Sequence, residues 1–192
     1  MEGWWAASYA VLWALVLVLC VVVVALARQI GTLHLRLGPR GALEMDDEGP
    51  PLGQSPPHAD VVAMDGSPLT IGGPSPARVL MFVSPGCLVC EQVLPALPVL
   101  ARTSKLEAIV VTDVDEAETK TAFGSKGLGL PVVSSREVMQ SYQVPGTPYV
   151  VVMDDRGLVR GKGTVNNLEQ MEGLIETALR RSREAGAERQ AS

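Results

Sequence analysis

Cysteine and histidine are scarce in this chain of 192 residues, which has three cysteines and two histidines. Three cysteines are too few for the disulfide framework that holds many small secreted domains together. A structural zinc site takes four ligands, whereas the one closely spaced cysteine pair supplies two, and His34 and His58 both lie well upstream of it. We therefore expect no bound metal and no other cofactor.

Positive charge is also in short supply. The 16 lysines and arginines are outnumbered by 21 aspartates and glutamates, which gives a formal net charge of −5. Proteins that bind nucleic acid present a clustered basic surface. The composition gives no support for such a surface, so we expect no nucleic-acid partner.

Charged residues are absent from residues 4–27, which read "WWAASYAVLWALVLVLCVVVVALA". At ~1.5 Å per helical residue, this run is long enough to cross a hydrocarbon core of ~30 Å. Trp4, Trp5 and Tyr9 stand at one end of it, as is typical of the membrane interface, and Cys20 within it is expected to act only as a small apolar residue. The run predicts one transmembrane anchor in contact with membrane lipid.

A cleaved signal peptide is the alternative for this run, with "ALA" at 25–27 as the cleavage site. The run is longer than an ordinary signal-peptide core, and no lysine or arginine precedes it, so we favour a retained anchor. Arg28, Arg36 and Arg40 follow the run. By the positive-inside rule, this distribution favours a cytoplasmic position for the rest of the chain.

The chain beyond the anchor divides into three parts by composition. Residues 28–60 predict a short juxtamembrane helix, which glycine and proline end, followed by a proline-rich linker with no potential to form a core. Residues 61–183 alternate between apolar runs and amphipathic stretches and predict one folded domain. Residues 184–192 predict a flexible tail.

Apolar runs and helical patterns alternate along the predicted domain. We expect buried strands at 77–84, 107–113 and 149–154, a short strand at 130–135, and strands at 61–71 and 158–163 that form hairpins. We expect helices at 88–103, 115–124 and 167–183. This order predicts an α/β sandwich with a mixed central sheet, whose hairpin at 149–163 forms an antiparallel edge.

Cys87 and Cys90 fall between a predicted strand and the helix that follows it. The free amide groups and the dipole at a helix N-terminus stabilise a thiolate at Cys87, and a spacing of three places Cys90 one turn further along the same face. Cys87 is then the candidate for attack on a partner disulfide, and Cys90 is the candidate resolving thiol. A purely structural disulfide is the alternative, although closing so short a loop adds little stability.

The sequence "VPGTPYVVVMD" places Thr147 and Pro148 immediately before a predicted strand. A bond between any residue and proline at the start of a strand is a candidate for a cis peptide. An ordinary trans proline in a turn is the alternative.

A strand, a C-x-x-C motif at the start of a helix and a downstream "GTP" before a hairpin resemble the thioredoxin superfamily. The resemblance implies that Thr147 pairs with the substrate backbone and that Pro148 lies against the Cys87–Cys90 disulfide. The chain departs from the family pattern at two positions, with Gly86 in place of an aromatic residue and an apolar residue near Met81 in place of an aspartate. Glu91 is a weak candidate for the missing proton acceptor and is more typical of a solvated helix surface.

A narrower resemblance covers nearly the whole chain. The anchor followed by "ALARQIGTLHLRLGPRGAL", together with "SPGCLVCEQVLPAL" and "VPGTPYVVVMDDRGLVRGKGTVNNLEQMEGLIE", resembles the MauD family of methylamine utilization proteins. The resemblance implies a thiol–disulfide oxidoreductase or isomerase, anchored in the inner membrane with its thioredoxin-like domain in the periplasm. Its protein substrate would be the disulfide-containing small subunit of methylamine dehydrogenase, and a membrane or periplasmic redox partner would renew the cysteine pair.

Three other functions remain open. A thiol reductant of the cytochrome c maturation type has the same anchor, linker and domain. A non-catalytic escort protein would keep Cys87 and Cys90 as a structural pair only. A peroxidase is the weakest alternative, because the residues "FVSPG" before Cys87 lack the threonine that peroxide reduction needs at the usual spacing.

Overall fold

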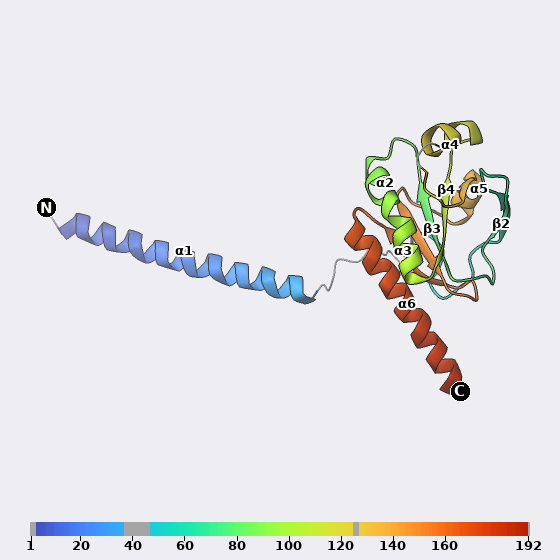
Figure 1. Ribbon diagram of the computed structural model, residues 1–192. Coiled ribbons are helices and arrows are strands. Elements are labelled where there is room, and N and C mark those ends of the chain that lie inside the picture. Colours follow the sequence, from blue (N-terminus) through green and yellow to red (C-terminus); the bar gives the residue numbers. More distant parts are fainter. Residues whose placement is uncertain (1–2, 37–46, 125–126, 192) are drawn as a thin grey trace. The chain divides into compact units, whose positions relative to one another are not determined.

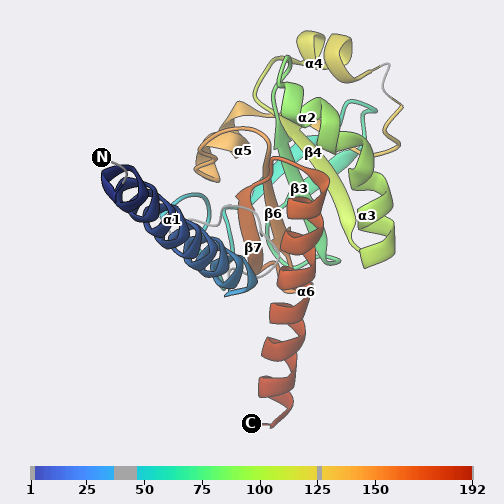
Figure 2. The ribbon, with the colours of Figure 1, turned by 90° about the vertical axis from the view of Figure 1, so that its left-hand side faces the viewer.

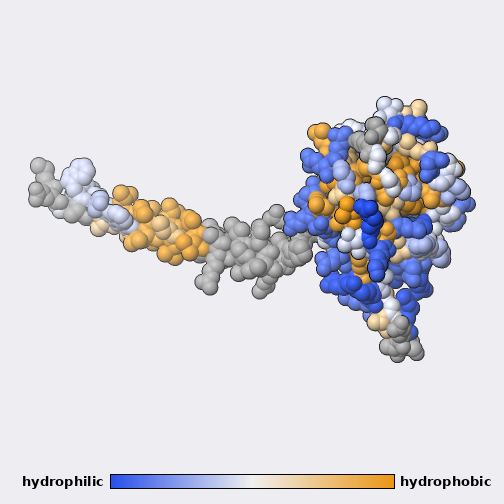
Figure 3. Space-filling model, viewed as in Figure 1, coloured by the Kyte–Doolittle hydropathy of each residue, from blue (hydrophilic) through white to orange (hydrophobic). Residues whose placement is uncertain are grey.

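The computed structural model describes residues 3–36, 47–124 and 127–191, and the chain forms two compact units, Met1–Pro39 and Arg40–Ser192. The first unit is a single helix, α1 (Gly3–Arg36). Its span Gly3–Val24 has a mean hydropathy of 2.8 and is not buried, and Figure 3 shows hydrophobic residues along the face in view. Among the described residues, only this helix is long and apolar enough to cross a membrane, as an anchor or as a signal sequence.

The predicted juxtamembrane helix is not a separate element where the structure describes it. Helix α1 continues without a break from the apolar run to Arg36. The residues expected to end that helix, Gly38, Pro39 and Gly41, lie outside the described residues.

A five-stranded mixed sheet forms the centre of the second unit (Figure 1), and its strand order is β5-β4-β3-β6-β7. Strands β3, β4 and β5 are parallel, and β6 and β7 are antiparallel to their neighbours. The strands are β3 (Arg78–Val83), β4 (Glu107–Thr112), β5 (Val132–Ser134), β6 (Tyr149–Met153) and β7 (Val159–Thr164). The predicted α/β sandwich with a mixed sheet and an antiparallel hairpin is confirmed.

Helices cover both faces of the sheet (Figure 2). Helices α2, α3 and α6 pack on one face, and α5 and the hairpin of β1 and β2 pack on the other. The remaining elements are α2 (Leu88–Val93), the 3₁₀ turn η1 (Leu94–Ala96), α3 (Leu97–Ser104), α4 (Glu116–Phe123), α5 (Arg136–Ser141), α6 (Leu168–Ala191), β1 (Ala59–Val62) and β2 (Pro68–Ile71).

Two helix predictions need correction. The single helix expected over 88–103 is interrupted by η1, because Pro95 and Pro98 have no amide hydrogen to donate and each occupies the first turn of a new segment. The tail 184–192, expected to be flexible, is helical as far as Ala191, since α6 continues through it.

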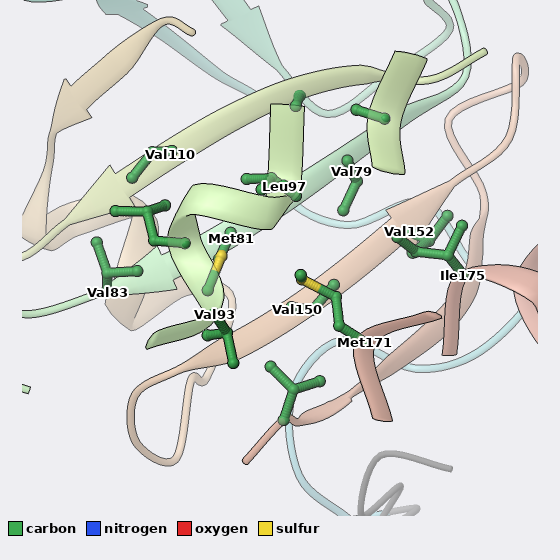
Figure 4. Close-up of a cluster of buried hydrophobic side chains, with 14 of the residues drawn as sticks. Val79, Met81, Val83, Val93, Leu97, Val110, Val150, Val152, Met171 and Ile175 are labelled. Carbon is green, nitrogen blue, oxygen red and sulfur yellow. The ribbon is translucent and has the colours of Figure 1, made fainter. Parts of the chain in front are cut away.

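The core lies in two layers because side chains alternate along each buried strand. In β3, Val79, Met81 and Val83 face α2, α3 and α6, whereas Leu80 and Phe82 face the opposite layer. Figure 4 shows the first layer, in which these side chains meet Val93, Leu97, Val110, Val150, Val152, Met171 and Ile175. This packing fixes α2, and with it the C-x-x-C motif, onto the end of β3.

The proline-rich segment at residues 48–58, which we call the strap, was expected to be a linker and instead packs against the domain. The amide of Gly53 donates to the carbonyl of Val159 at 2.8 Å, and the amide of Val159 donates to the carbonyl of Gln54 at 3.0 Å. Strand β7 is an edge strand with open backbone groups, and the non-proline residues of the strap satisfy two of them. The expectation that this segment has no potential to form a core fails here, since Gly49, Pro50 and Pro56 are buried.

Candidate functional site

Cys87 lies at the N-cap of α2, four residues after β3 ends at Val83. A tight turn brings the chain there, in which Gly86 has a φ of 75° and the amide of Cys87 donates to the carbonyl of Ser84 at 3.3 Å. The amide of Cys90 donates to Sγ of Cys87 at 3.1 Å. The first sulfur thus occupies the position at a helix start where backbone amides stabilise a negative charge, as the motif predicts.

Cys87 and Cys90 form a disulfide, with 5.2 Å between their Cα atoms. The two sulfurs differ in access. Cys87 is half-buried at the surface, whereas Cys90 is 2 % exposed and belongs to the apolar cluster under α2. An incoming thiolate can therefore reach Cys87 and is kept from Cys90, and this asymmetry matches the predicted roles of attacking and resolving cysteine.

The loop before β6 lies directly beside the cysteine pair. The carbonyl oxygen of Thr147 is 3.7 Å from Sγ of Cys87, and Pro148 is buried next to it. Strand β6 runs antiparallel to β3, with Phe82 opposite Tyr149, so the end of one strand and the start of the other meet at the same edge of the sheet. The Thr147–Pro148 bond is cis, which confirms that prediction.

The rim of the site is open to a polypeptide. Leu88 is 74 % exposed, and Gly86, Pro145 and Gly146 are exposed as well. A chain laid over these residues would contact Cys87 and Thr147 together. This exposed rim of apolar and glycine residues suits contact with a polypeptide.

A polar contact that the sequence analysis missed supports the turn before Cys87. The hydroxyl of Ser84 donates to Oδ1 of Asp113 at 3.1 Å and ties the end of β3 to the loop after β4. Each residue is the first polar one after a buried strand, and the ends of neighbouring parallel strands meet at one edge of a sheet. A polar residue directly after each of two buried strands is therefore the sequence pattern that could have predicted this hydrogen bond.

The surroundings of Cys90 are apolar, as the sequence indicated. Met81, which is fully buried in the same cluster, has no carboxylate, and the carboxylate of Glu91 is exposed on α2. Neither residue therefore places a buried carboxylate beside the thiol. Among the described residues, the buried carboxylate is that of Asp154, which follows β6 at the turn into β7. His58 lies 3.7 Å from Asp60, and no cluster of three metal-ligating side chains occurs in the described part of the chain.

Comparison with known sequences gives close relatives. No family model matches the chain. It is 37 % identical to the methylamine utilization protein MauD of Methylobacillus flagellatus over 180 residues, which cover 92 % of this chain and 87 % of the relative. It is 35 % identical to MauD of Methylorubrum extorquens, covering 88 % and 84 %, and 33 % identical to MauD of Paracoccus denitrificans, covering 92 % and 90 %.

Solved structures with the same fold are more distant in sequence. The thioredoxin domain of a thiol-disulfide oxidoreductase from Bacteroides vulgatus is 18 % identical, with a TM-score of 0.55, over 65 % of this chain and 95 % of that one. StoA from Bacillus subtilis is 17 % identical, with a TM-score of 0.52, over 61 % and 95 %. These similarities establish a thioredoxin-like fold for the domain.

Proposed function

The chain belongs to the MauD family of methylamine utilization proteins, and from this membership we propose that it is a membrane-anchored thiol–disulfide exchange protein. Its proposed substrate is the small subunit of methylamine dehydrogenase, whose disulfides it would form or isomerise during maturation. The observation that carries the proposal is the accessible sulfur of Cys87, bonded to the buried Cys90 and facing the carbonyl of Thr147 at 3.7 Å.

The proposed reaction starts from the disulfide form. A substrate thiolate attacks Sγ of Cys87, the Cys87–Cys90 bond breaks, and Cys90 leaves as a thiolate that then takes up a proton. A second substrate thiolate attacks the substrate sulfur of this mixed disulfide and displaces Cys87 as a thiolate. The substrate thereby loses two electrons, and the cysteine pair gains them. In isomerisation, Cys87 as a thiolate attacks a substrate disulfide and releases one substrate thiolate; a different substrate thiolate then attacks the substrate sulfur of the mixed disulfide and displaces Cys87, so the substrate and the cysteine pair end at the oxidation levels they started from.

Local structure favours the departure of Cys87. Its sulfur accepts from the amide of Cys90 at 3.1 Å and lies at the start of α2, so a negative charge there is stabilised when the substrate is released. Thr147 and Pro148 are the proposed substrate-binding residues, since a polypeptide paired with Thr147 would present its own sulfur to Cys87. A redox partner in the membrane or the periplasm would then reoxidise the pair.

We place the exchange domain in the periplasm and α1 in the inner membrane as a retained anchor. Stable disulfides form outside the cytosol, which keeps thiols reduced, so the proposed substrate requires this orientation. Arg28, Arg36 and Arg40 favour the opposite orientation by the positive-inside rule. Alkaline phosphatase fused after residue 192 is expected to be active; an inactive fusion, with a β-galactosidase fusion active instead, would refute the periplasmic placement.

Replacing Cys87 and Cys90 together by serine tests the function. In a strain that depends on this gene, we expect the small subunit to lose its disulfides and methylamine dehydrogenase activity to disappear, while c-type cytochromes stay at normal levels. A mature dehydrogenase in the double variant would favour the escort function. Loss of c-type cytochromes instead would favour the thiol reductant of cytochrome c maturation.

A further inference from the structure

Lys162 lies in the interior of β7 and is only 1 % exposed. Its Nζ donates to the carbonyl of Glu48 at 2.6 Å, and the hydroxyl of Tyr149 donates to the same carbonyl at 3.2 Å. Two side chains of the hairpin of β6 and β7 thus converge on one backbone group at the start of the strap. We call Lys162, Tyr149, Glu48 and Gly49 the clamp.

Gly49 and Tyr149 of the clamp are packed in close contact. Gly49 is buried with a φ of 68°, and a Cβ atom at this position would collide with the hydroxyl of Tyr149. Only glycine lets the strap backbone lie against the tyrosine ring without strain. A lysine in the interior of a sheet is costly unless its amino group is hydrogen-bonded, and the carbonyl of Glu48 meets that need.

The clamp adjoins the exchange site through Tyr149. This residue follows Pro148 directly, and Thr147, two positions before it, has its carbonyl 3.7 Å from Sγ of Cys87. Its ring lies 6.5 Å from that of Phe82, the residue opposite it on β3. The clamp therefore holds Tyr149, the first residue of β6, directly after the loop that faces Cys87.

We propose that Lys162 is a positioning residue for disulfide exchange with a polypeptide. By holding Glu48 and Gly49 against Tyr149, it fixes Thr147 and Pro148 opposite Cys87. This inference rests on the proposed function, because it assumes that a substrate chain pairs with Thr147. When the clamp is loosened, the loop of Thr147 and Pro148 shifts while the cysteine pair on α2 stays in place. A polypeptide then loses affinity, whereas a small thiol still reacts.

The test uses the full chain in detergent micelles and two probes, dithiothreitol as a small dithiol and reduced, unfolded ribonuclease A as a polypeptide. In single turnovers that start from the disulfide form, we expect kcat/KM of Lys162→Met for the polypeptide to fall about tenfold through KM, the concentration at half-maximal rate, with the rate for dithiothreitol within about twofold of wild type. Gly49→Ala should act in the same way, because it unseats the strap without touching Lys162. Lys162→Arg, which keeps a donor, should recover part of the loss.

Arg160→Met is the matched control, since Arg160 lies on the same strand and pairs with Asp154. It should leave both rates per folded molecule unchanged. Where Lys162→Met fails to fold, Tyr149→Phe, which removes a single hydroxyl from the clamp, decides the question by the same KM. An unchanged KM in the clamp variants, or an equal rise in Arg160→Met, would overturn the positioning role alone. A wild-type chain that reacts with neither probe would overturn the proposed function.

Discussion

The two ends of the hairpin of β6 and β7 hold their buried charges in different ways. At the turn end, Nε of Arg160 donates to Oδ2 of Asp154 at 2.7 Å, and Oδ1 of Asp154 accepts from the amides of Arg156 and Leu158. At the site end, Lys162 reaches a carbonyl that lies 114 residues earlier in the chain. The ion pair at the turn joins residues six positions apart, whereas the hydrogen bond of Lys162 depends on the strap.

This contrast separates stability from function. The ion pair at the turn is nearly dry, with side-chain exposures of 13 % for Arg160 and 2 % for Asp154, and it touches no residue of the exchange site. The clamp lies beside the loop that faces Cys87. We therefore expect changes at the turn to alter folding alone and changes at the clamp to alter substrate binding too.

Breaking the turn end should give the largest loss of stability. Asp154→Ala leaves the guanidinium of Arg160 buried without its partner and removes the acceptor of two turn amides. We expect the free energy of unfolding to fall by about 3–5 kcal/mol, as is usual when one member of a buried ion pair is removed. Urea unfolding followed by circular dichroism measures this. Exchange rates per folded molecule should stay at the wild-type value, and a raised KM for a polypeptide would contradict the separation.

Removing one hydroxyl from the clamp should have a smaller effect. Tyr149→Phe keeps the ring contact with Phe82 and leaves the carbonyl of Glu48 with one donor fewer. We expect a loss of about 1 kcal/mol in the free energy of unfolding, measured by urea titration. A gain in stability would show that the bond from Tyr149 to Glu48 does not hold the strap.

Tyr142 sharpens the comparison because it packs against the same phenylalanine without a partner for its hydroxyl. Its ring lies 5.6 Å from that of Phe82, and its buried oxygen has no hydrogen-bond partner among the described residues. Tyr142→Phe removes an unsatisfied polar group, so we expect a gain of up to about 1 kcal/mol in the free energy of unfolding. One series of urea titrations can measure both changes in the free energy of unfolding, which we expect to have opposite signs for Tyr142→Phe and Tyr149→Phe. A loss at Tyr142 would contradict its unpaired state.

The same tyrosine predicts a dependence on pH. Burial raises the pKa of Tyr142 above its ordinary value, and the charge of Arg78 opposes that shift. A tyrosine with a raised pKa in the folded state contributes its full stability below pH about 10 and loses it as the pH rises further, since the unfolded chain ionises first. The free energy of unfolding should thus decline above pH about 10, and Tyr142→Phe should make the decline shallower.

The elements that were predicted correctly are those that depend on residues close to one another in the sequence. Continuous apolar runs indicated the buried strands, and the position of Cys87 between a strand and a helix indicated its place at a helix start. The strap was predicted wrongly because its partners, Val159 and Lys162, lie more than a hundred residues further along the chain. The bond between Ser84 and Asp113 joins two strand ends that become neighbours only in the folded sheet.

Trapping of a mixed disulfide tests the exchange chemistry most directly. In a chain whose third cysteine is removed by Cys20→Ser, Cys90→Ser removes the resolving thiol. When the thiolate of Cys87 then attacks a polypeptide that carries a disulfide, one sulfur of that disulfide leaves as a thiolate and the other should stay bonded to Cys87. Mass spectrometry of the adduct should find the link at Cys87 in this variant and no adduct in Cys87→Ser. Equal adducts in the two variants, or none in either, would contradict the assignment of Cys87 as the sulfur that meets the substrate.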